Sequence, residues 1–283
     1  MAKLHVGKSL QDTDVLWRYV PLDKFINLID TSTLFFAPLA WYEKTDPFEG
    51  YLPRVAMEAI ASISAKTVDI TTERINALEK LLPANLHAQE LDRLRQMAQD
   101  HKSQMRALYK NMVSCLMVNC WYRSAHESEG MWGLYSKDGI AIKTSVGAIK
   151  AALAENQQDH VIHMGAIKYL DFTSTNLTPS DCVTQDGHLI GMTKRVAYAH
   201  ENEVRMYITR PRELGSNEDL KPAPANVSVD IAKLIEGVVI SPFAGTSLRQ
   251  SIQTVCRWGG IDPSKVSTSN LLENCEHLLD VYS

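Results

Sequence analysis

The sequence predicts a single α+β domain over residues 1–283, with a mostly antiparallel sheet and a helical insertion at about residues 54–112. Two observations lead to this fold class. Short runs of β-branched and aromatic residues alternate along the chain with segments of helical periodicity. The stretch at about 54–112 instead carries its apolar residues at helical spacing throughout. The sequence shows no internal repeat or low-complexity tract.

Composition narrows the class of protein. Of 283 residues, 45% are hydrophobic and 22% are charged, which is typical of a soluble globular protein. The net charge of −4 gives no general attraction to nucleic acid or anionic membrane. No apolar run approaches the roughly 20 residues of a transmembrane helix, and the first residues contain no apolar signal core. The five cysteines include no Cys-x-x-Cys pair. We therefore expect reduced thiols in a cytoplasmic protein without a membrane partner.

The first half of the chain predicts a strand at 15–20, a helix at 22–30 that begins after Pro21, and a strand at 33–37. The loop at 41–50 contains turn-forming steps and more aromatic residues than a connecting loop needs. In the insertion, an apolar stripe predicts an amphipathic helix packed on the domain. Its members are Leu94, Met97, Ala98, His101, Met105, Leu108 and Met112.

The second half predicts several shorter elements. We expect strands at 113–121, 139–144, 164–169, 235–241 and 265–269, and helices at 146–155, 189–199 and 247–258. A short helix follows Ser128, which is suited to cap its N-terminus.

The stretch 198–208 is expected to form a strand, because polar and apolar residues alternate along it. The apolar face consists of Val204, Met206 and Ile208. The polar face consists of Glu201, Glu203, Arg205 and Tyr207. Such a charged row is costly if it is buried without partners. It therefore lies either at the surface or along a cleft.

The sequence lacks the motifs of several common catalytic sites. The chain has no His-Glu-x-x-His motif, so no metal site is predicted. It has no Gly-x-Ser-x-Gly motif of a hydrolase and no glycine-rich loop of a P-loop or dinucleotide-binding fold. Its basic residues form no run that would indicate a nucleic-acid scaffold.

Four polar and aromatic clusters remain, far apart in the sequence. They are Trp17-Arg18-Tyr19, Asp46-Pro47-Phe48-Glu49, Met131-Trp132-x-x-Tyr135 and Glu201-x-Glu203-x-Arg205. Each has a structural explanation by itself: the tryptophans belong to the core, and Arg18 or Arg205 forms an ion pair with Glu203. Together they fit one cleft for a ligand with flat rings and anionic groups, in which arginine holds phosphate or carboxylate.

In this order, the four clusters resemble a widespread bacterial family of uncharacterised proteins, over about residues 16–207. The chain is also distantly similar to ADP-ribosyltransferases. These carry an Arg or His on a first strand, then a helix and an aromatic or Ser-rich motif, and a Glu on a later strand, often as Glu-x-Glu. Here Arg18, Leu34-Phe35-Phe36-Ala37 and Glu201-x-Glu203 match that order. The resemblance implies a split, mostly antiparallel sheet and an enzyme that consumes NAD as its substrate.

The resemblance also implies roles for individual residues. Arg18 would hold the NAD phosphates or the nicotinamide ribose. Glu203 would bond the ribose 2′-hydroxyl and stabilise an oxocarbenium-like state, and Glu201 would orient or deprotonate the acceptor. Phe36 or Tyr42 would stack on nicotinamide. The other expected NAD-binding residues are Tyr19, Asp46, Glu49, Trp132, Tyr135 and Arg205.

By the same analogy, the activity is that of an ADP-ribosyltransferase or an NAD glycohydrolase of the bacterial toxin or phage-defence type. The acceptor is an unidentified protein or nucleic acid. Two alternatives stay open. The first is a non-catalytic module that senses a nucleotide or a protein in the same cleft. The second is a magnesium-dependent nuclease that uses the carboxylates of Asp46, Glu49, Glu201 and Glu203.

Overall fold

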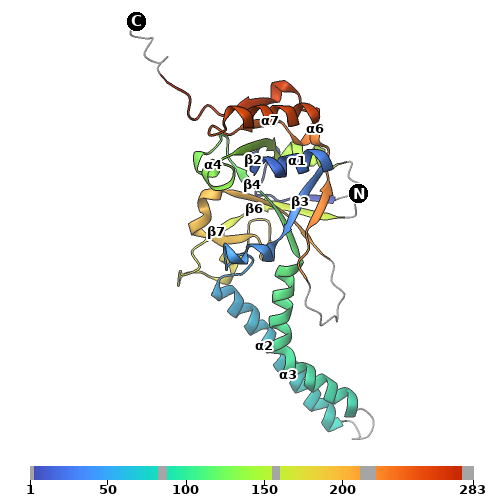
Figure 1. Ribbon diagram of the computed structural model, residues 1–283. Coiled ribbons are helices and arrows are strands. Elements are labelled where there is room, and N and C mark those ends of the chain that lie inside the picture. The colour runs from blue at the N-terminus through green and yellow to red at the C-terminus, as the bar shows by residue number, and fades with distance from the viewer. Residues whose placement is uncertain (1–2, 82–87, 155–159, 211–220, 276–283) are drawn as a thin grey trace.

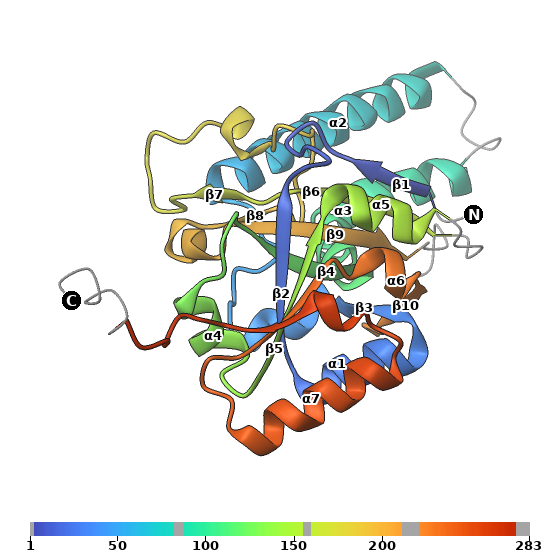
Figure 2. The same ribbon diagram turned by 90° about the horizontal axis from the view of Figure 1, so that it is seen from above.

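The computed structural model of the chain describes residues 3–81, 88–154, 160–210 and 221–275. It is a mixed α/β structure built on one large, mostly antiparallel sheet (Figures 1 and 2), as the predicted α+β class requires. The strand order is β1-β6-β9-β4-β2-β5-β11-β12, and β3 pairs with both β4 and β10. The pairs β1/β6 and β11/β12 are parallel, and the other pairs of this sheet are antiparallel.

The strands of the large sheet are β1 (Lys3–Val6), β2 (Val15–Pro21), β3 (Thr33–Pro38), β4 (Leu116–Arg123), β5 (Gly139–Ser145), β6 (Val161–Ala166), β9 (Glu203–Thr209), β10 (Ala225–Ser228), β11 (Gly237–Ile240) and β12 (Val266–Thr268). A second, two-stranded parallel sheet consists of β7 (Lys168–Leu170) and β8 (Thr193–Arg195).

The α-helices are α1 (Leu22–Thr31), α2 (Arg54–Leu81), α3 (Ala88–Cys115), α4 (Glu129–Tyr135), α5 (Val146–Leu153), α6 (Ile231–Leu234) and α7 (Thr246–Trp258). The described residues also include the short 3-10 helices η1 (Leu39–Lys44), η2 (Pro179–Cys182), η3 (Val196–Glu201) and η4 (Pro263–Lys265). Helices α1, α5, α6 and α7 pack on the sheet through the main hydrophobic core.

Strand β9 bears out part of the expected alternation. Val204, Met206 and Ile208 face the main core, while Glu203 and Arg205 point to the other side of the sheet. Glu201, however, is not on this strand. It ends η3, and Asn202 in the left-handed region, with φ 34°, reverses the chain before β9 begins.

Two other predictions need correction. The expected helix at 189–199 is in fact strand β8 followed by η3. The expected strand at 113–121 begins only at Leu116, because the preceding three residues end helix α3. Helix α4 follows Ser128 as expected, and the Ser128 hydroxyl accepts a hydrogen bond from the Met131 amide.

The sheet divides along one edge of β4. At one end, Trp17 and Leu16 of β2 pair with β4 residues 122–123. At the other end, β3 pairs with β4 residues 117–118. Within the described chain, residues 119–121 of β4 have no strand neighbour on that edge. Strands β2 and β3 therefore diverge on either side of this segment, and the sheet is split there.

Helices α2 and α3 occupy the stretch in which a helical insertion is expected, and they form an arm that projects from the body of the protein (Figure 1). The apolar stripe predicted on α3 does not pack against the body along its length. Leu94, His101 and Met105 are half-buried, and Leu108 and Met112 are exposed. The side chain of Met97 lies outside the described residues.

Candidate functional site

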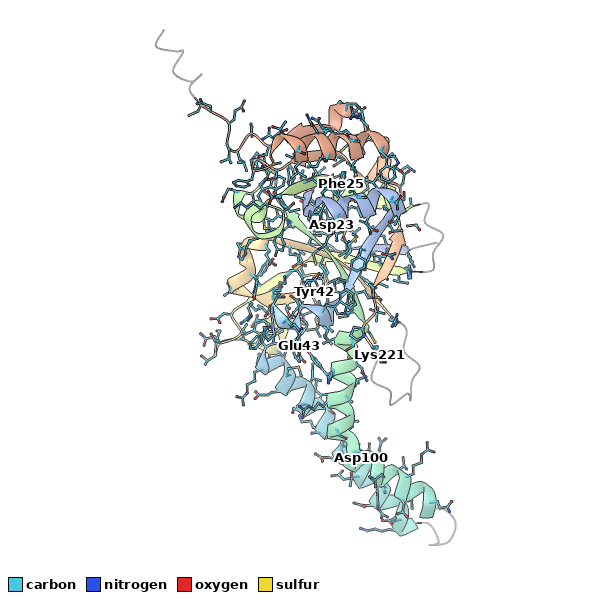
Figure 3. The ribbon with its side chains drawn as sticks, in the orientation of Figure 1. Asp23, Phe25, Tyr42, Glu43, Asp100 and Lys221 are labelled. Atoms are coloured by element: carbon cyan, nitrogen blue, oxygen red, sulfur yellow. The ribbon has the colours of Figure 1, made fainter. Side chains whose placement is uncertain are left out.

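A cavity of about 790 Å³ opens where β2 and β3 diverge from β4. Side chains from β2, β3, β4, β5, β8, β9, α1, α4, η1, η3 and the loop after η1 line it. Figure 3 shows Tyr42 of η1 near the middle of the body and Asp23 of α1 above it, and both residues line the cavity. The volume lies within the range of about 300–1,000 Å³ that is usual for small-molecule sites.

A buried ionic cluster forms one wall of this cavity. Arg205 donates to Glu203 (Nε–Oε1 2.7 Å), to Glu49 (Nη1–Oε1 2.7 Å) and to the Gly191 carbonyl (2.6 Å). Lys194 lies 2.7 Å from Glu203 and 3.5 Å from Glu49. Burial alone would raise the pKa of Glu203, but Arg205 and Lys194 lower it to about 2. Glu203 is therefore held in its ionised form.

Glu201 is the third acid of this cluster. Its carboxylate accepts hydrogen bonds from Lys194 (Nζ–Oε2 2.6 Å) and from the Tyr135 hydroxyl (2.7 Å). Its side chain is 11% exposed, against 3% for Glu49 and 4% for Glu203. Three carboxylates against two cations leave one unit of negative charge uncompensated. Among these acids, Glu201 is the one best placed to meet a ligand.

A second ion pair fixes the loop after η1. Arg195 donates to Asp46 (Nη2–Oδ1 2.7 Å), and its guanidinium lies 4.6 Å from the centre of the Phe48 ring. The Asp46 carboxylate also accepts from the Phe48 amide. Asp46 is buried, so it and Arg195 tie the loop at 45–49 to the segment β8–η3.

Arg18 occupies the gap between the diverging strands. Its guanidinium lies 5.6 Å from the centre of the Trp121 ring, and burial lowers the pKa of Arg18. Within the described part of the chain, the Arg18 guanidinium makes no hydrogen bond and no ion pair. The ion pair between Arg18 and Glu203, which is one structural explanation of these residues, is not formed; Glu203 instead pairs with Arg205 and Lys194. Arg18 is half-buried and lines the cavity. A cation without a counter-ion at such a position favours an anionic ligand.

Tyr42 lines the same cavity and lies near both Arg18 and the ionic cluster. Burial raises the pKa of Tyr42 to about 12, with further influence from Cys120, Arg205 and Arg18. Among the described residues, its hydroxyl has no hydrogen-bond partner. The neutral phenol therefore offers both a ring and a free polar group to a ligand.

Most of the predicted site residues line this one cavity, although they come from four distant clusters. They are Arg18, Tyr19, Tyr42, Asp46, Glu49, Tyr135, Glu201, Glu203 and Arg205. Two are corrected by the structure. The Phe36 ring is fully buried in the main core, and the neighbouring Phe35 lines the cavity in its place. Trp132 is also fully buried; it packs edge-on against Tyr19 and donates to Glu127.

Some residues at the site are not indicated by any sequence pattern. Lys194, which contacts all three glutamates, falls within the expected helix at 189–199 but lies on strand β8. Cys120 and Trp121 of β4 form the floor. Burial and the nearby Glu203 raise the pKa of the Cys120 thiol to about 12, so this thiol stays protonated.

The acids of the site are not arranged for a metal ion. Glu49, Glu201 and Glu203 face Lys194 or Arg205, and Asp46 faces Arg195. Among the described residues, no group of three or more His, Cys, Asp or Glu side chains has a geometry that could hold a metal. This arrangement gives no support to the magnesium-dependent nuclease.

Comparisons of the chain with protein-family models, with curated proteins and with solved structures found no match. In the ranges that the structure describes, no helix is both long enough and apolar enough to cross a membrane. The interpretation of the site therefore depends on its own geometry.

Proposed function

We propose that the protein binds NAD in this cavity and cleaves its nicotinamide–ribose bond, as an ADP-ribosyltransferase or an NAD glycohydrolase. The observation that carries the proposal is the pairing, in one cavity, of the unpaired cation Arg18 with a carboxylate cluster of net negative charge. NAD has both an anionic pyrophosphate and a sugar carbon that becomes positive as nicotinamide leaves. The two features of the cavity complement these two parts of the molecule.

In this proposal, Arg18 holds a phosphate group in a bidentate manner, and the Tyr42 ring packs against a flat ring of the ligand. The negative charge of the cluster stabilises the oxocarbenium-like state as the C–N bond breaks. Nicotinamide leaves with the bonding electrons, and water or an acceptor group attacks the ribose carbon. Glu201 is the carboxylate proposed to contact the ribose or the acceptor, because it is more exposed than Glu203.

The geometry thus changes the roles assigned to the two glutamates. Glu203 is bound by Arg205 through two nitrogens and also by Lys194. Its proposed role is to fix Lys194 and Arg205 and to contribute charge, whereas direct contact with the substrate falls to Glu201. The split sheet, with β2 and β3 diverging from β4, supports the proposed likeness to the ADP-ribosyltransferase fold.

One observation favours a second candidate, a nucleotide-sensing module without catalysis. Each acid of the cluster already accepts from Lys194 or Arg205, so no carboxylate is free to act as a general base. A module of this kind would bind NAD or a related nucleotide through Arg18 and Tyr42 without cleaving it.

Titration calorimetry with NAD, followed by chromatography for free nicotinamide, tests both candidates. Under the enzymatic proposal, the wild-type chain binds NAD and releases nicotinamide. Glu201→Gln then retains binding and loses most turnover, and Arg18→Met weakens binding by about 10–100-fold, the value of one charged hydrogen bond. Glu236→Gln, which alters an exposed carboxylate that does not line the cavity, serves as the control.

The outcomes separate the candidates. Binding without nicotinamide release, in the presence of candidate acceptors, supports the sensing module and rejects the enzyme. If the chain shows no heat of binding with NAD, NADP or ADP-ribose, both are rejected. Unchanged turnover in Glu201→Gln would reject the role proposed for Glu201.

A further inference from the structure

The base of the arm lies against the segment that carries Glu49. Tyr109 is near the C-terminal end of α3, where this helix meets η1 and β4. The Tyr109 hydroxyl donates to the Gly50 carbonyl (3.1 Å) and accepts from the Leu52 amide (3.0 Å). One side chain of the arm thus fixes the backbone immediately after Glu49.

The Tyr109 side chain is itself well held. It packs between two small hydrophobic clusters, one of which contains Leu39 and the other Leu52. The centre of the Tyr51 ring lies 5.7 Å from that of Tyr109. Burial raises the pKa of Tyr109 to about 12. The hydroxyl therefore keeps its proton at neutral pH and can both donate and accept.

Gly50 allows the segment to approach the arm closely. It has φ +82°, in the region that favours glycine. A Cβ at this position would lie 2.9 Å from the Leu39 side chain and 3.0 Å from that of Val113. The backbone at Gly50 is thus in direct contact with both η1 and α3. The position of the neighbouring Glu49 therefore depends on where the base of α3 lies.

Glu49 supplies one of the three carboxylates of the ionic cluster. Its side chain is 3% exposed, with Oε1 2.7 Å from Arg205 Nη1 and Oε2 3.5 Å from Lys194 Nζ. Without Glu49, the two remaining acids would only balance the two cations. Glu49 thus provides the excess negative charge by which the cavity is proposed to stabilise the oxocarbenium-like state.

We propose that Tyr109 is a positioning residue that holds Glu49 in the ionic cluster, so that the base of the arm determines the net charge of the cavity. This inference rests on the proposed cleavage of NAD. On the N-terminal side of Glu49, the backbone is already fixed. The Glu49 amide donates to the Asp46 carbonyl (2.9 Å), and Arg195 binds the Asp46 carboxylate. Tyr109 supplies the corresponding anchor on the C-terminal side.

Tyr109→Phe removes only the hydroxyl and tests this role. At saturating NAD, the rate of nicotinamide release is expected to fall about tenfold, the value of one hydrogen bond. Calorimetry is expected to show an affinity within about twofold of wild type and one NAD per chain, because Arg18 is unchanged. A merely structural defect would instead reduce the amount of NAD bound per chain. Tyr51→Phe, at an exposed position that does not line the cavity, is the control and should leave turnover unchanged.

Glu49→Gln identifies the route by which Tyr109 acts. This substitution is expected to lower turnover by itself, because it removes the excess charge. If the Tyr109 hydroxyl acts through Glu49, adding Tyr109→Phe to Glu49→Gln lowers turnover no further. Wild-type turnover in Tyr109→Phe overturns the proposal. So does an effect of Tyr109→Phe that persists in full when Glu49 is already Gln.

Urea unfolding carries the same test without NAD. Substitutions within one hydrogen-bonded network are not additive. The loss of unfolding free energy caused by Tyr109→Phe is therefore expected to be smaller in Glu49→Gln than in the wild-type chain. Additive losses overturn the proposal. A wild-type chain that does not bind or cleave NAD would reject the enzymatic function, and the unfolding measurements would still decide whether Tyr109 holds Glu49.

Discussion

Replacing Lys194 by Met tests whether the ionic cluster is held together as described. The Lys194 nitrogen lies 2.6, 2.7 and 3.5 Å from Glu201, Glu203 and Glu49, and its side chain is 10% exposed. Methionine fills a similar volume but removes the charge. Removing one partner from a buried ion pair costs about 3–5 kcal/mol. In Lys194→Met, the single cation Arg205 remains against three carboxylates, so we expect a loss near the middle of this range, roughly 4 kcal/mol.

Urea unfolding at neutral pH, monitored by tryptophan fluorescence, measures this change. A loss of roughly 4 kcal/mol corresponds to a fall in melting temperature on the order of 10 °C for a chain of this size. Lys150→Met is the matched control, because Lys150 pairs with Asp12 at 2.8 Å but both side chains are largely exposed. Exposed pairs contribute about 0–1 kcal/mol. If the two variants lost similar stability, the reasoning about burial would be refuted.

Three further predictions concern pH, thiol chemistry and one turn. The folded-state pKa of Glu203, about 2, is below its ordinary value of 4.5, so its contribution to stability is fully present above about pH 4.5. We expect roughly 3 kcal/mol to be lost as the pH falls from 4.5 through 2, and acid titration of Glu203→Gln should lack this component. The half-buried Cys120 thiol, with a pKa of about 12, should resist alkylation at pH 8 in the native protein while the exposed Cys275 reacts, as peptide mapping by mass spectrometry would detect. Gly50→Ala should cost more than 1 kcal/mol in urea unfolding, because Gly50 has φ +82° and a Cβ there would lie 2.9 Å from a Leu39 methyl group. Gly133→Ala is its control and should not lower stability, because Gly133 lies inside α4 with open space around an added Cβ.

Local patterns predicted the regular elements better than the site. The alternation along 204–208 identified β9 because only one face of that strand meets the core. The same alternation made Phe35 and Phe36 point to opposite faces, but it did not say which face was the cavity. That depends on where β2 and β3 separate from β4, which is a tertiary property.

Lys194 illustrates a second limit. The segment around Lys194 contains apolar residues at a spacing compatible with a helix. In the structure, Lys194 instead belongs to a three-residue strand that pairs with β7. A strand this short has no periodicity that a sequence pattern can reveal. The role of Lys194 also arises from acids on η3, on β9 and in the loop after η1. No local pattern in the sequence relates these four positions.

The divergence of β2 and β3 also determines whether the cavity is open before a ligand binds. The Asn119 side chain donates to the Phe35 carbonyl (2.9 Å) and accepts from the Trp121 indole (2.6 Å). It thereby satisfies a carbonyl that continued strand pairing would otherwise satisfy. This hydrogen bond favours a split that persists without a bound ligand, because the Phe35 carbonyl needs no strand partner there. A ligand that binds here meets a preformed site. Little binding free energy is therefore lost to ordering the protein around it.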